Sequence, residues 1–280
     1  MSAIILDGKS LANEIKDSLC AEIKGFQNPP HLSVILIGDD PASKIYVGHK
    51  EKACNKIGLK STSYRLKADV PQEEVDSLID KLNCDVNVHG ILLQLPLPSH
   101  LDSFSLISRI DPKKDVDCFT PVNLGNLLRG LSYFEPCTPA GIIALLEKYD
   151  VECKGKKAVI LGRSNIVGKP MALMLLKKDA TVTICHSKTA FIDKEIKNAD
   201  IIVAAIGKSR LVQKEWIKNG AVVIDVGMNR LPDGTLTGDV DFDAVKEVAS
   251  MITPVPGGVG PMTIAMLMKN TVKAYKEQII

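Results

Sequence analysis

Three polar residues recur along one expected helix at a spacing that suits chemistry on a flat ligand. Ser43, Tyr46 and Lys50 are three and four residues apart, so a helix would present them on one face. The Lys50 ammonium could supply a positive charge or move a proton, and the Tyr46 ring could stack on a planar group. The same spacing is also typical of a solvated helix face, so the pattern alone leaves both interpretations open.

Polar residues elsewhere in the chain could complete such a site. Gln94 lies at the carboxyl end of the apolar stretch Val88–Leu95, where its amide needs hydrogen-bonding partners. Its side chain could orient Lys50 or simply cap a loop. Asp115 and Asp117 lie in an irregular stretch, and either could pair with Lys50 or accept hydrogen bonds from an amino-heterocycle.

A second kind of site is indicated by the apolar run Val159–Leu161 and the glycine turn Gly162–Gly168 that follows it. Helical periodicity resumes after the turn, and strand, glycine turn and helix form the first unit of a dinucleotide-binding fold. Such a turn directs a helix N-terminus toward a pyrophosphate. The middle glycine of the usual G-x-G-x-x-G pattern is absent, so a purely structural turn is the alternative.

The residues after the next expected strand favour a 2′-phosphate on that dinucleotide. NAD-binding proteins place an acid about 20 residues beyond the glycines, but residues 185–188 contain none. Ser187 and Lys188 occur there instead, and Arg163 lies in the glycine turn. Donors and cations suit a phosphate, so the chemistry favours NADP over NAD, although ordinary solvated cations would give the same pattern.

The elements that would carry these residues alternate between strands and helices. This order predicts an α/β protein with mainly parallel sheets, divided into a substrate lobe over 1–136 and a Rossmann-type lobe over 137–261. The expected strands are Ala3–Leu6, Leu32–Ile37, Ser61–Leu66, Val88–Leu95, Ala158–Leu161, Thr181–Cys185, Ile201–Ala205 and Val222–Val226. The expected helices cover residues 12–23, 41–57, 71–82, 138–149, 171–176 and 262–275. The last of these could close either lobe.

Ligands of parallel sheets bind beyond the carboxyl ends of the strands. The residues expected to contact the dinucleotide are Gly162, Arg163, Ser164, Ile166, Val167, Gly168, Ser187, Thr138, Gly207 and Asp225. The glycines of Thr253–Pro261 would allow a backbone to approach a ligand closely, or would form a stiff turn before the last helix.

Composition excludes several classes of function. The 280 residues suit one large or two ordinary domains, and a net charge of +2 without a basic tract argues against nucleic acid. No apolar run reaches membrane-spanning length, and the N-terminus is charged too early for a signal peptide. Seven scattered cysteines without a Cys-x-x-Cys pair indicate neither a zinc site nor a disulfide framework. We therefore expect a cytoplasmic enzyme with reduced thiols and no metal.

Five segments occur in an order that closely resembles one family. They are Ser43–Lys50, Gly90–Pro98, Lys114–Asp117, Gly162–Gly168 and Pro256–Thr263. Together they resemble the bifunctional methylenetetrahydrofolate dehydrogenase/methenyltetrahydrofolate cyclohydrolase family, nearly from end to end. The combination of Tyr-x-x-x-Lys with Pro-Gly-Gly-Val-Gly-Pro is highly specific.

The resemblance implies an activity, a cofactor and an assembly. The reaction would be NADP-dependent oxidation of 5,10-methylenetetrahydrofolate to 5,10-methenyltetrahydrofolate, followed by hydrolysis to 10-formyltetrahydrofolate. The protein would be a homodimer, and residues 262–280 would return to the first lobe. Lys50 would be catalytic, with Tyr46 stacking on the folate, Gln94 as the partner of the lysine and Asp117 binding the pterin. Further folate contacts would be Ser43, Pro256, Gly257 and Gly258.

One residue departs from the family pattern. The family usually has Asp-Val-Asp-Gly-Phe, and Cys118 replaces that glycine here. If the backbone needs a positive φ, Cys118 adds strain beside Asp117, and its thiol could make the enzyme sensitive to thiol reagents. Two other functions stay open: a dehydrogenase for a small hydroxy or amino acid, and a non-catalytic dinucleotide sensor.

Overall fold

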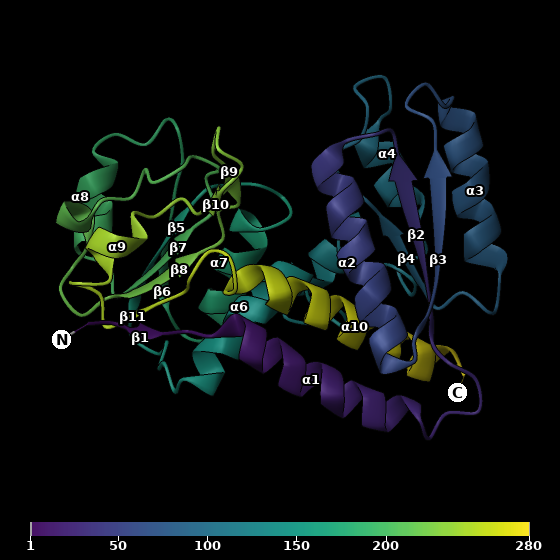
Figure 1. The fold of residues 1–280 in the computed structure, drawn as a ribbon, viewed down its shortest axis with the longest axis horizontal. Coiled ribbons are helices and arrows are strands. Elements are labelled where there is room, and N and C mark those ends of the chain that lie inside the picture. The colour runs from purple at the N-terminus through teal and green to yellow at the C-terminus, as the bar shows by residue number, and fades with distance from the viewer. Residues whose placement is uncertain (1, 280) are drawn as a thin grey trace. The chain divides into compact units, whose positions relative to one another are not determined.

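The computed structural model describes residues 2–279, which form two compact units. One comprises the N-terminal segment up to Ala12 and Thr138–Thr263, and we call it the six-stranded unit. The other comprises Asn13–Cys137 and the chain from Ile264 onward, and we call it the three-stranded unit. Each unit is thus completed by a segment distant in sequence (Figure 1). Three helices contain the unit boundaries: α1 (Gly8–Ile23), α6 (Cys137–Lys148) and α10 (Val259–Gln278).

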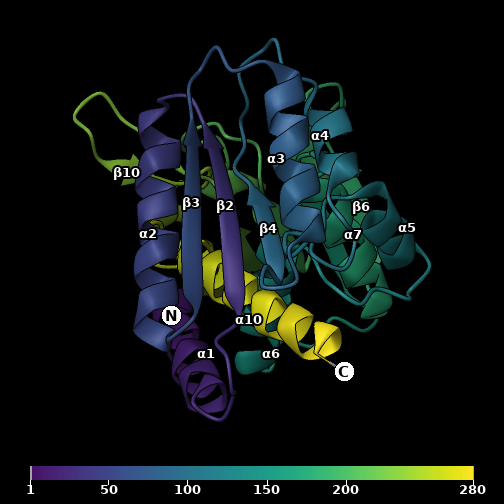
Figure 2. The same cartoon turned by 90° about the vertical axis from the view of Figure 1, so that its right-hand side faces the viewer.

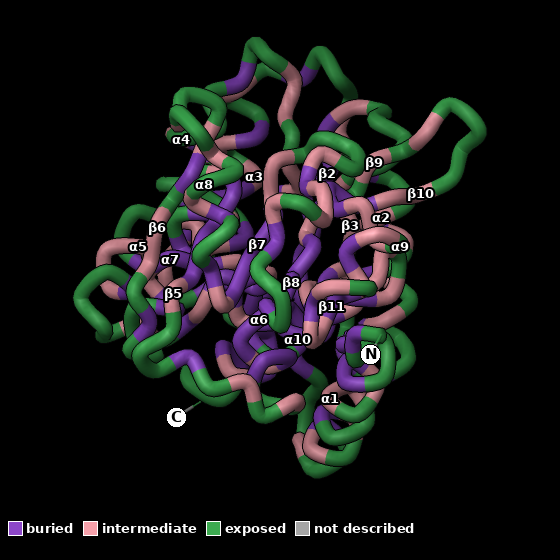
Figure 3. The backbone as a smooth tube through the Cα atoms, turned by 90° about the vertical axis from the view of Figure 1, so that its left-hand side faces the viewer, coloured by how far each residue is buried: buried purple, intermediate pink, exposed green. Residues whose placement is uncertain are grey.

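The six-stranded unit is built on a sheet with the strand order β1-β11-β8-β7-β5-β6, in which every pairing is parallel. The strands are β1 (Ile4–Ile5), β5 (Lys157–Leu161), β6 (Thr181–Cys185), β7 (Ile201–Ala204), β8 (Val222–Asp225) and β11 (Met251–Ile252). Strands β7 and β8 are buried along their whole length (Figure 3). This agrees with their runs of Val and Ile, because strands covered on both faces carry continuous apolar sequence.

The chain reverses direction across this sheet at β5. It passes from β5 through α7 (Gly168–Lys177) to β6, and then through α8 (Ile192–Lys197) back across β5 to β7. The reversal makes the carboxyl edge between β5 and β7 the switch point where open parallel sheets bind ligands. The remaining elements are η1 (Lys214–Trp216), β9 (Asn229–Arg230), β10 (Leu236–Thr237) and α9 (Phe242–Val245).

The three-stranded unit has a parallel sheet with the order β3-β2-β4. Its elements are β2 (His31–Ile37), α2 (Pro41–Ile57), β3 (Lys60–Leu66), α3 (Gln72–Cys84), β4 (Gly90–Leu93), α4 (Ser103–Arg109) and α5 (Pro121–Leu128). Helices α2 and α3 flank this sheet (Figures 1 and 2). Ile35 and Ile37 of β2 pack with Val75 and Ile79 of α3 in one apolar cluster. Only three residues separate the end of β2 from the start of α2, so the sheet positions the N-terminus of this helix.

Helix α2 has the boundaries that its sequence predicts. The Asp40 carboxylate accepts a hydrogen bond from Ser43 N at 2.7 Å, and Pro41 occupies the first turn, as in many capped helices. Gly58 ends the helix with φ +82°, a conformation that glycine adopts without steric cost. The α/β class, the Rossmann-type sheet and the return of the last helix to the first lobe are confirmed, since α10 is hydrogen-bonded within the three-stranded unit.

Three local features differ from the expectation. The N-terminal strand β1 pairs with β11, so residues before Ala12 join the six-stranded unit instead of the first lobe. Helix α10 begins at Val259, inside the proline-glycine run, because the first helical turn tolerates proline. The irregular stretch contains α5, whose start is capped by a hydrogen bond from Asn123 N to Thr120 Oγ1 at 3.3 Å. Across residues 2–279, none of the helices is both long enough and apolar enough to cross a bilayer.

Candidate active site and dinucleotide site

Lys50 is buried, with only 5% of its surface exposed. Its Nζ donates a hydrogen bond to Gln94 Oε1 at 3.0 Å. Gln94 Nε2 donates in turn to Leu95 O at 2.7 Å, which fixes the amide with its oxygen toward the lysine. Gln94 therefore orients Lys50, and the alternative of a solvated lysine is wrong, because a buried ammonium needs such partners.

Asp117 is the carboxylate that interacts with Lys50. Burial lowers the pKa of Lys50, and the charge of Asp117 opposes that shift. Burial likewise raises the pKa of Asp117, against the pull of the Lys50 charge. Desolvation is the larger cause for both groups, so each is more readily neutral than it would be in water. The lowered pKa makes the neutral amine of Lys50, the form that can accept a proton, easier to reach than it is for a lysine in water.

Asp115 makes different contacts from Asp117, although the residue pattern left open which of the two pairs with Lys50. Its carboxylate accepts hydrogen bonds from Phe119 N at 3.0 Å, Thr120 N at 2.8 Å and Asn123 Nδ2 at 2.9 Å. The residue is 2% exposed. Asp115 thus shapes the loop that leads into α5, because a buried carboxylate must satisfy its acceptor sites.

Tyr46 and Ser43 lie on α2 beside Lys50. The Lys50 Nζ is 5.2 Å from the centroid of the Tyr46 ring, within the range of a cation–π contact. Ser43 is buried, whereas Tyr46 is partly exposed. The structure thus brings Ser43, Tyr46, Lys50, Gln94 and Asp117 into one unit, and a partly exposed ring beside a buried lysine suits a planar ligand.

Cys118 has the backbone conformation that its family position suggests. Its φ is +61°, so a glycine would be less strained there. The thiol is fully buried and donates to Phe134 O at 3.3 Å. Burial raises the pKa of this thiol, and a protonated buried thiol is a poor nucleophile. The expected sensitivity of Cys118 to thiol reagents is therefore not supported.

Two residues that contact this site were not among the predicted site residues. Cys137 lies against Asp117 and donates to Val116 O at 3.3 Å. Asn270 of α10 donates to Val116 O at 2.8 Å and Glu135 O at 3.0 Å. Asn270 is 154 residues away from Val116, so no local pattern could have predicted the contact.

The glycine turn after β5 requires glycine at both ends. Gly162 has φ +125°, and a Cβ on it would lie 2.2 Å from Ala205 O. A Cβ on Gly168 would lie 2.2 Å from Gly162 O. These separations are far below van der Waals contact. The turn is therefore packed against the loop that follows β7, at the switch point of the sheet.

Side chains at this edge are placed to meet a ligand. Arg163, Ser164 and Ile166 are exposed, and Val167 is partly exposed. Ser187 is exposed beyond β6, and β6 pairs with β5 in register up to Leu161 and Cys185. Arg163 and Ser187 thus follow neighbouring strands at one edge. The Ser164 hydroxyl accepts hydrogen bonds from Val167 N at 3.1 Å and Gly168 N at 3.3 Å, which stabilises the start of α7.

Three further predicted cofactor residues differ in their surroundings. Gly207 is exposed in the loop after β7, with φ +72°. Asp225 is 3% exposed, and its carboxylate accepts three backbone hydrogen bonds. Burial raises the pKa of Asp225 to about 6. Thr138 Oγ1 lies 3.0 Å from Thr263 Oγ1. Gly207 lies two residues beyond Ala205, which packs against the glycine turn. The Asp225 carboxylate, in contrast, already accepts hydrogen bonds from three backbone N–H groups.

The loop at Pro256–Gly258 is held by the start of α1. A Cβ on Gly8 would lie 1.9 Å from Gly258 O, and Lys9 N donates to Gly257 O at 2.8 Å. Gly257 has φ +109°, so the conformation itself requires glycine. The loop is thus held in a defined conformation within the six-stranded unit. Its contact with folate is proposed from the family pattern.

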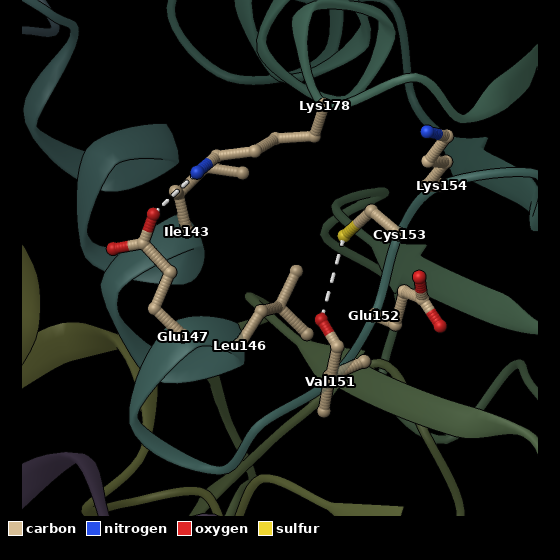
Figure 4. A pocket seen from close by; sticks show the side chains of 8 residues that line it. All are labelled: Ile143, Leu146, Glu147, Val151, Glu152, Cys153, Lys154 and Lys178. Carbon is tan, nitrogen blue, oxygen red and sulfur yellow. Dashed lines mark hydrogen bonds and ion pairs between the residues drawn. The ribbon is translucent and has the colours of Figure 1, made fainter.

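A small hollow of the six-stranded unit is a different feature. It encloses about 220 Å³ between α6, residues 151–154 and Lys178 (Figure 4). An ion pair of 2.5 Å between Lys178 and Glu147 lies beside it. The volume is below the roughly 300 Å³ of ordinary ligand pockets, and its lining includes none of the predicted cofactor residues. We assign it no part in the site.

The parallel sheet with a glycine turn at its switch point, together with a buried lysine site in a second α/β unit, defines a two-unit protein of the Rossmann-type dehydrogenase class. Residues 6–117 match the catalytic domain of the tetrahydrofolate dehydrogenase/cyclohydrolase family, and residues 136–279 match its NAD(P)-binding domain. The chain belongs to this family.

Similar proteins cover the chain nearly completely. Bifunctional protein FolD of Maridesulfovibrio salexigens is 55% identical, over 98% of this chain and 99% of its own length. The crystal structure of the bifunctional FolD enzyme from Campylobacter jejuni is 48% identical, with a TM-score of 0.96 and 99% of each chain covered. That of the Trypanosoma brucei enzyme, solved with NADP and an inhibitor, is 40% identical, with a TM-score of 0.96 over 100% of this chain and 99% of its own. These likenesses support neither a dehydrogenase for small acids nor a non-catalytic sensor.

Proposed function

We infer that the chain is a bifunctional enzyme of folate one-carbon chemistry. It oxidises 5,10-methylenetetrahydrofolate to the 5,10-methenyl form in an NADP-dependent reaction, and then hydrolyses that form to 10-formyltetrahydrofolate. The observation that carries this inference is the buried Lys50, hydrogen-bonded to Gln94 and facing Asp117. Family membership supplies the substrate class.

The six-stranded unit suits NADP at its switch point. Gly162 and Gly168 let the turn pack closely against Ala205 and against itself, and a tight turn of this kind directs the N-terminus of the following helix toward a pyrophosphate. We propose that Arg163 and Ser187 hold the 2′-phosphate, and that Ser164, Ile166, Val167, Gly207 and Thr138 line the remainder. Asp225 supports this edge through the backbone groups that it binds. When bound, NADP+ supplies the hydride acceptor.

We propose that Lys50 moves the protons of the hydrolytic step. The neutral amine takes a proton from water as the water oxygen attacks the methenyl carbon. The resulting ammonium returns a proton to N5 of the folate as the bond between carbon and N5 breaks, and the hydroxyl proton of the adduct leaves to solvent. The Gln94 oxygen accepts a hydrogen bond from both forms of the lysine, so it holds the group in place without trapping its charge.

The other residues would bind and orient the folate. Asp117 would accept hydrogen bonds from the amino-substituted pterin, and the Tyr46 ring would stack on the substrate. Ser43, Pro256, Gly257 and Gly258 are proposed substrate contacts because they match the family pattern. These assignments concern positioning, which is the main requirement of hydride transfer between two bound molecules.

A homodimer is proposed through the edge strand β6. Within residues 2–279 this strand ends the sheet and pairs on one side only, with β5. Its Thr181 and Ile184 are exposed, and an edge with free backbone groups and an apolar side chain can pair with a second copy. Ile184→Lys should give a monomer in light scattering after size exclusion. A dimer of unchanged affinity would place the contact elsewhere.

A cytoplasmic location is proposed from the thiols. All seven cysteines are free, and five of them are buried. Reduced, buried thiols are typical of reducing compartments. Fractionation of the native source would test this, and recovery in an oxidising compartment would contradict it.

The role of Lys50 is tested by Lys50→Met with both activities measured. Ring opening of supplied methenyltetrahydrofolate should be abolished, whereas NADPH formation should persist in part, because the methyl-terminated chain still fills the buried space. Lys52→Met, an exposed lysine of the same helix, is the matched control. Equal loss of both activities, with folate still bound, would contradict the assigned role.

A further inference from the structure

Asp239 holds the loop that follows β7 by a set of hydrogen bonds to one carboxylate. The residue is fully buried. Ile206 N and Gly207 N donate to its Oδ2 at 2.6 and 2.9 Å, and Lys208 N donates to its Oδ1 at 2.9 Å. Asn229 Nδ2 also donates to Oδ1, at 2.9 Å. Three consecutive backbone N–H groups therefore converge on a single buried side chain.

A second buried acid fixes the backbone of Asp239. The Asp225 carboxylate, at the end of β8, accepts hydrogen bonds from the N–H groups of Asp239 and Val240, both at 2.9 Å. The fit is close, because a Cβ on Gly238 would lie 1.8 Å from Asp225 Oδ2. The end of β8 thus holds residues 238–240, and Asp239 in turn holds the loop after β7.

The loop in question lies at the switch point of the sheet. Ala205 N donates to Leu161 O at 2.8 Å, and the missing Cβ of Gly162 would meet Ala205 O at 2.2 Å. Ile206–Lys208 therefore continue directly from the segment that touches the glycine turn. Gly207 is exposed, and a Cβ built on it meets nothing within 4 Å.

We propose that Asp239 is a positioning residue for the dinucleotide, holding Ile206–Lys208 in the shape against which NADP binds. The proposal rests on the cofactor site proposed above. Because the three N–H groups point inward to the carboxylate, the loop presents the open face at Gly207 to the cofactor. A loop held before the ligand arrives needs no ordering on binding, and that preorganisation strengthens affinity.

An amide cannot replace this carboxylate. The carboxylate oxygens only accept, and all four partners of Asp239 donate. An asparagine would direct its NH2 group at one or more of these donors, so the loop would lose at least one of its bonds. We expect Asp239→Asn to raise the KM for NADP+ about tenfold, with a smaller change in kcat.

The test measures both activities of the full chain in Asp239→Asn and in Asp241→Asn. The control removes the same charge two residues away, from a side chain that makes no cap hydrogen bond to α9. Hydrolysis of supplied methenyltetrahydrofolate, which needs no cofactor, should stay within twofold of the parent in both variants. A merely structural role for Asp239 would instead lower this hydrolysis together with NADPH formation, at unchanged KM, and would overturn the proposal.

A third variant separates this proposal from the cofactor site itself. Gly207→Asn keeps a residue that tolerates positive φ but places a side chain on the open face. If both Gly207→Asn and Asp239→Asn raise the KM for NADP+, the proposal holds. If only Gly207→Asn does, the site stands and Asp239 has no positioning role. If neither does, the loop is not part of the cofactor site. Should Asp239→Asn not fold, Asn229→Ala removes one bond to the same carboxylate and should raise the KM by a few fold; an unchanged KM there would also overturn the proposal.

Discussion

Replacing Gln94 by glutamate would place a full negative charge where a neutral oxygen now accepts from Lys50. The distance between Gln94 Oε1 and Lys50 Nζ is 3.0 Å. At that separation two unit charges attract by roughly 5 kcal/mol with an effective dielectric constant of about 20. Since one pKa unit corresponds to about 1.4 kcal/mol, the pKa of Lys50 would rise by up to about 4 units. This rise would oppose the lowering of the Lys50 pKa that burial causes.

The consequence is specific to the hydrolytic step. An ammonium held by a carboxylate cannot take a proton from water, so cyclohydrolase activity at pH 7 should fall at least about 100-fold, while its pH–rate profile moves to higher pH. NADPH formation should fall less, because the charge on Lys50 does not take part in hydride transfer in our scheme. The assay follows the absorbance of methenyltetrahydrofolate and of NADPH between pH 6 and pH 10.

Gln27→Glu, which adds the same charge at an exposed position, controls for net charge. An unshifted profile in Gln94→Glu, with the fold intact, would refute the reasoning, because it would mean that the protonation of Lys50 does not limit hydrolysis. A uniform loss of both activities would show that Gln94 acts on substrate binding.

Three further predictions concern the rest of the molecule. Gly162→Ala should abolish NADP binding and leave hydrolysis of methenyltetrahydrofolate, since its Cβ would lie 2.2 Å from Ala205 O; titration calorimetry with NADP+ checks this, and unchanged affinity would contradict it. Burial is the main cause that lowers the pKa of His89 to about 4, so the unfolded chain takes up its proton first, and stability present above pH 6.5 should decline by about 3 kcal/mol as pH falls toward 4. Urea unfolding at pH 7 and pH 4.5 should show a weaker pH dependence in His89→Gln, and an equal one would exclude this histidine as a cause. Lys114→Met should cost about 2–3 kcal/mol of unfolding free energy, because Nζ donates to Leu82 O, Asn83 O and Asp85 O at the end of α3; a thermal melt that matches the parent would show that these bonds are replaced by water.

Local sequence determined most of the elements. The cap at Asp40, the proline after it and the stop at Gly58 are contained in neighbouring residues, and they locate α2 without reference to the remainder of the fold. The same holds for the buried strands, whose runs of Val and Ile are long enough to be recognised alone. Helix α5 could also have been found from Thr120 and Pro121, which cap and begin it.

The sequence predicted which residues lie around Lys50, but not which contacts each of them makes. Spacing brings Ser43, Tyr46 and Lys50 to one helix face, and the family pattern adds Gln94 and Asp117. Which aspartate meets the lysine could not be decided from the sequence, because the loop that carries both is held at Val116 O by Asn270, which lies 154 residues further along the chain.

Only the tertiary structure determined which side chains support the loops of the two sites. Asn270 reaches Val116 across 154 residues, and Asp239 holds a loop more than thirty residues before it in the chain. The N-terminal strand β1 joins the far end of the six-stranded sheet by pairing with β11. The physical reason is common to all three: periodicity and capping act over a few residues, whereas backbone and side-chain hydrogen-bonding groups pair with the partners that the finished fold brings within reach.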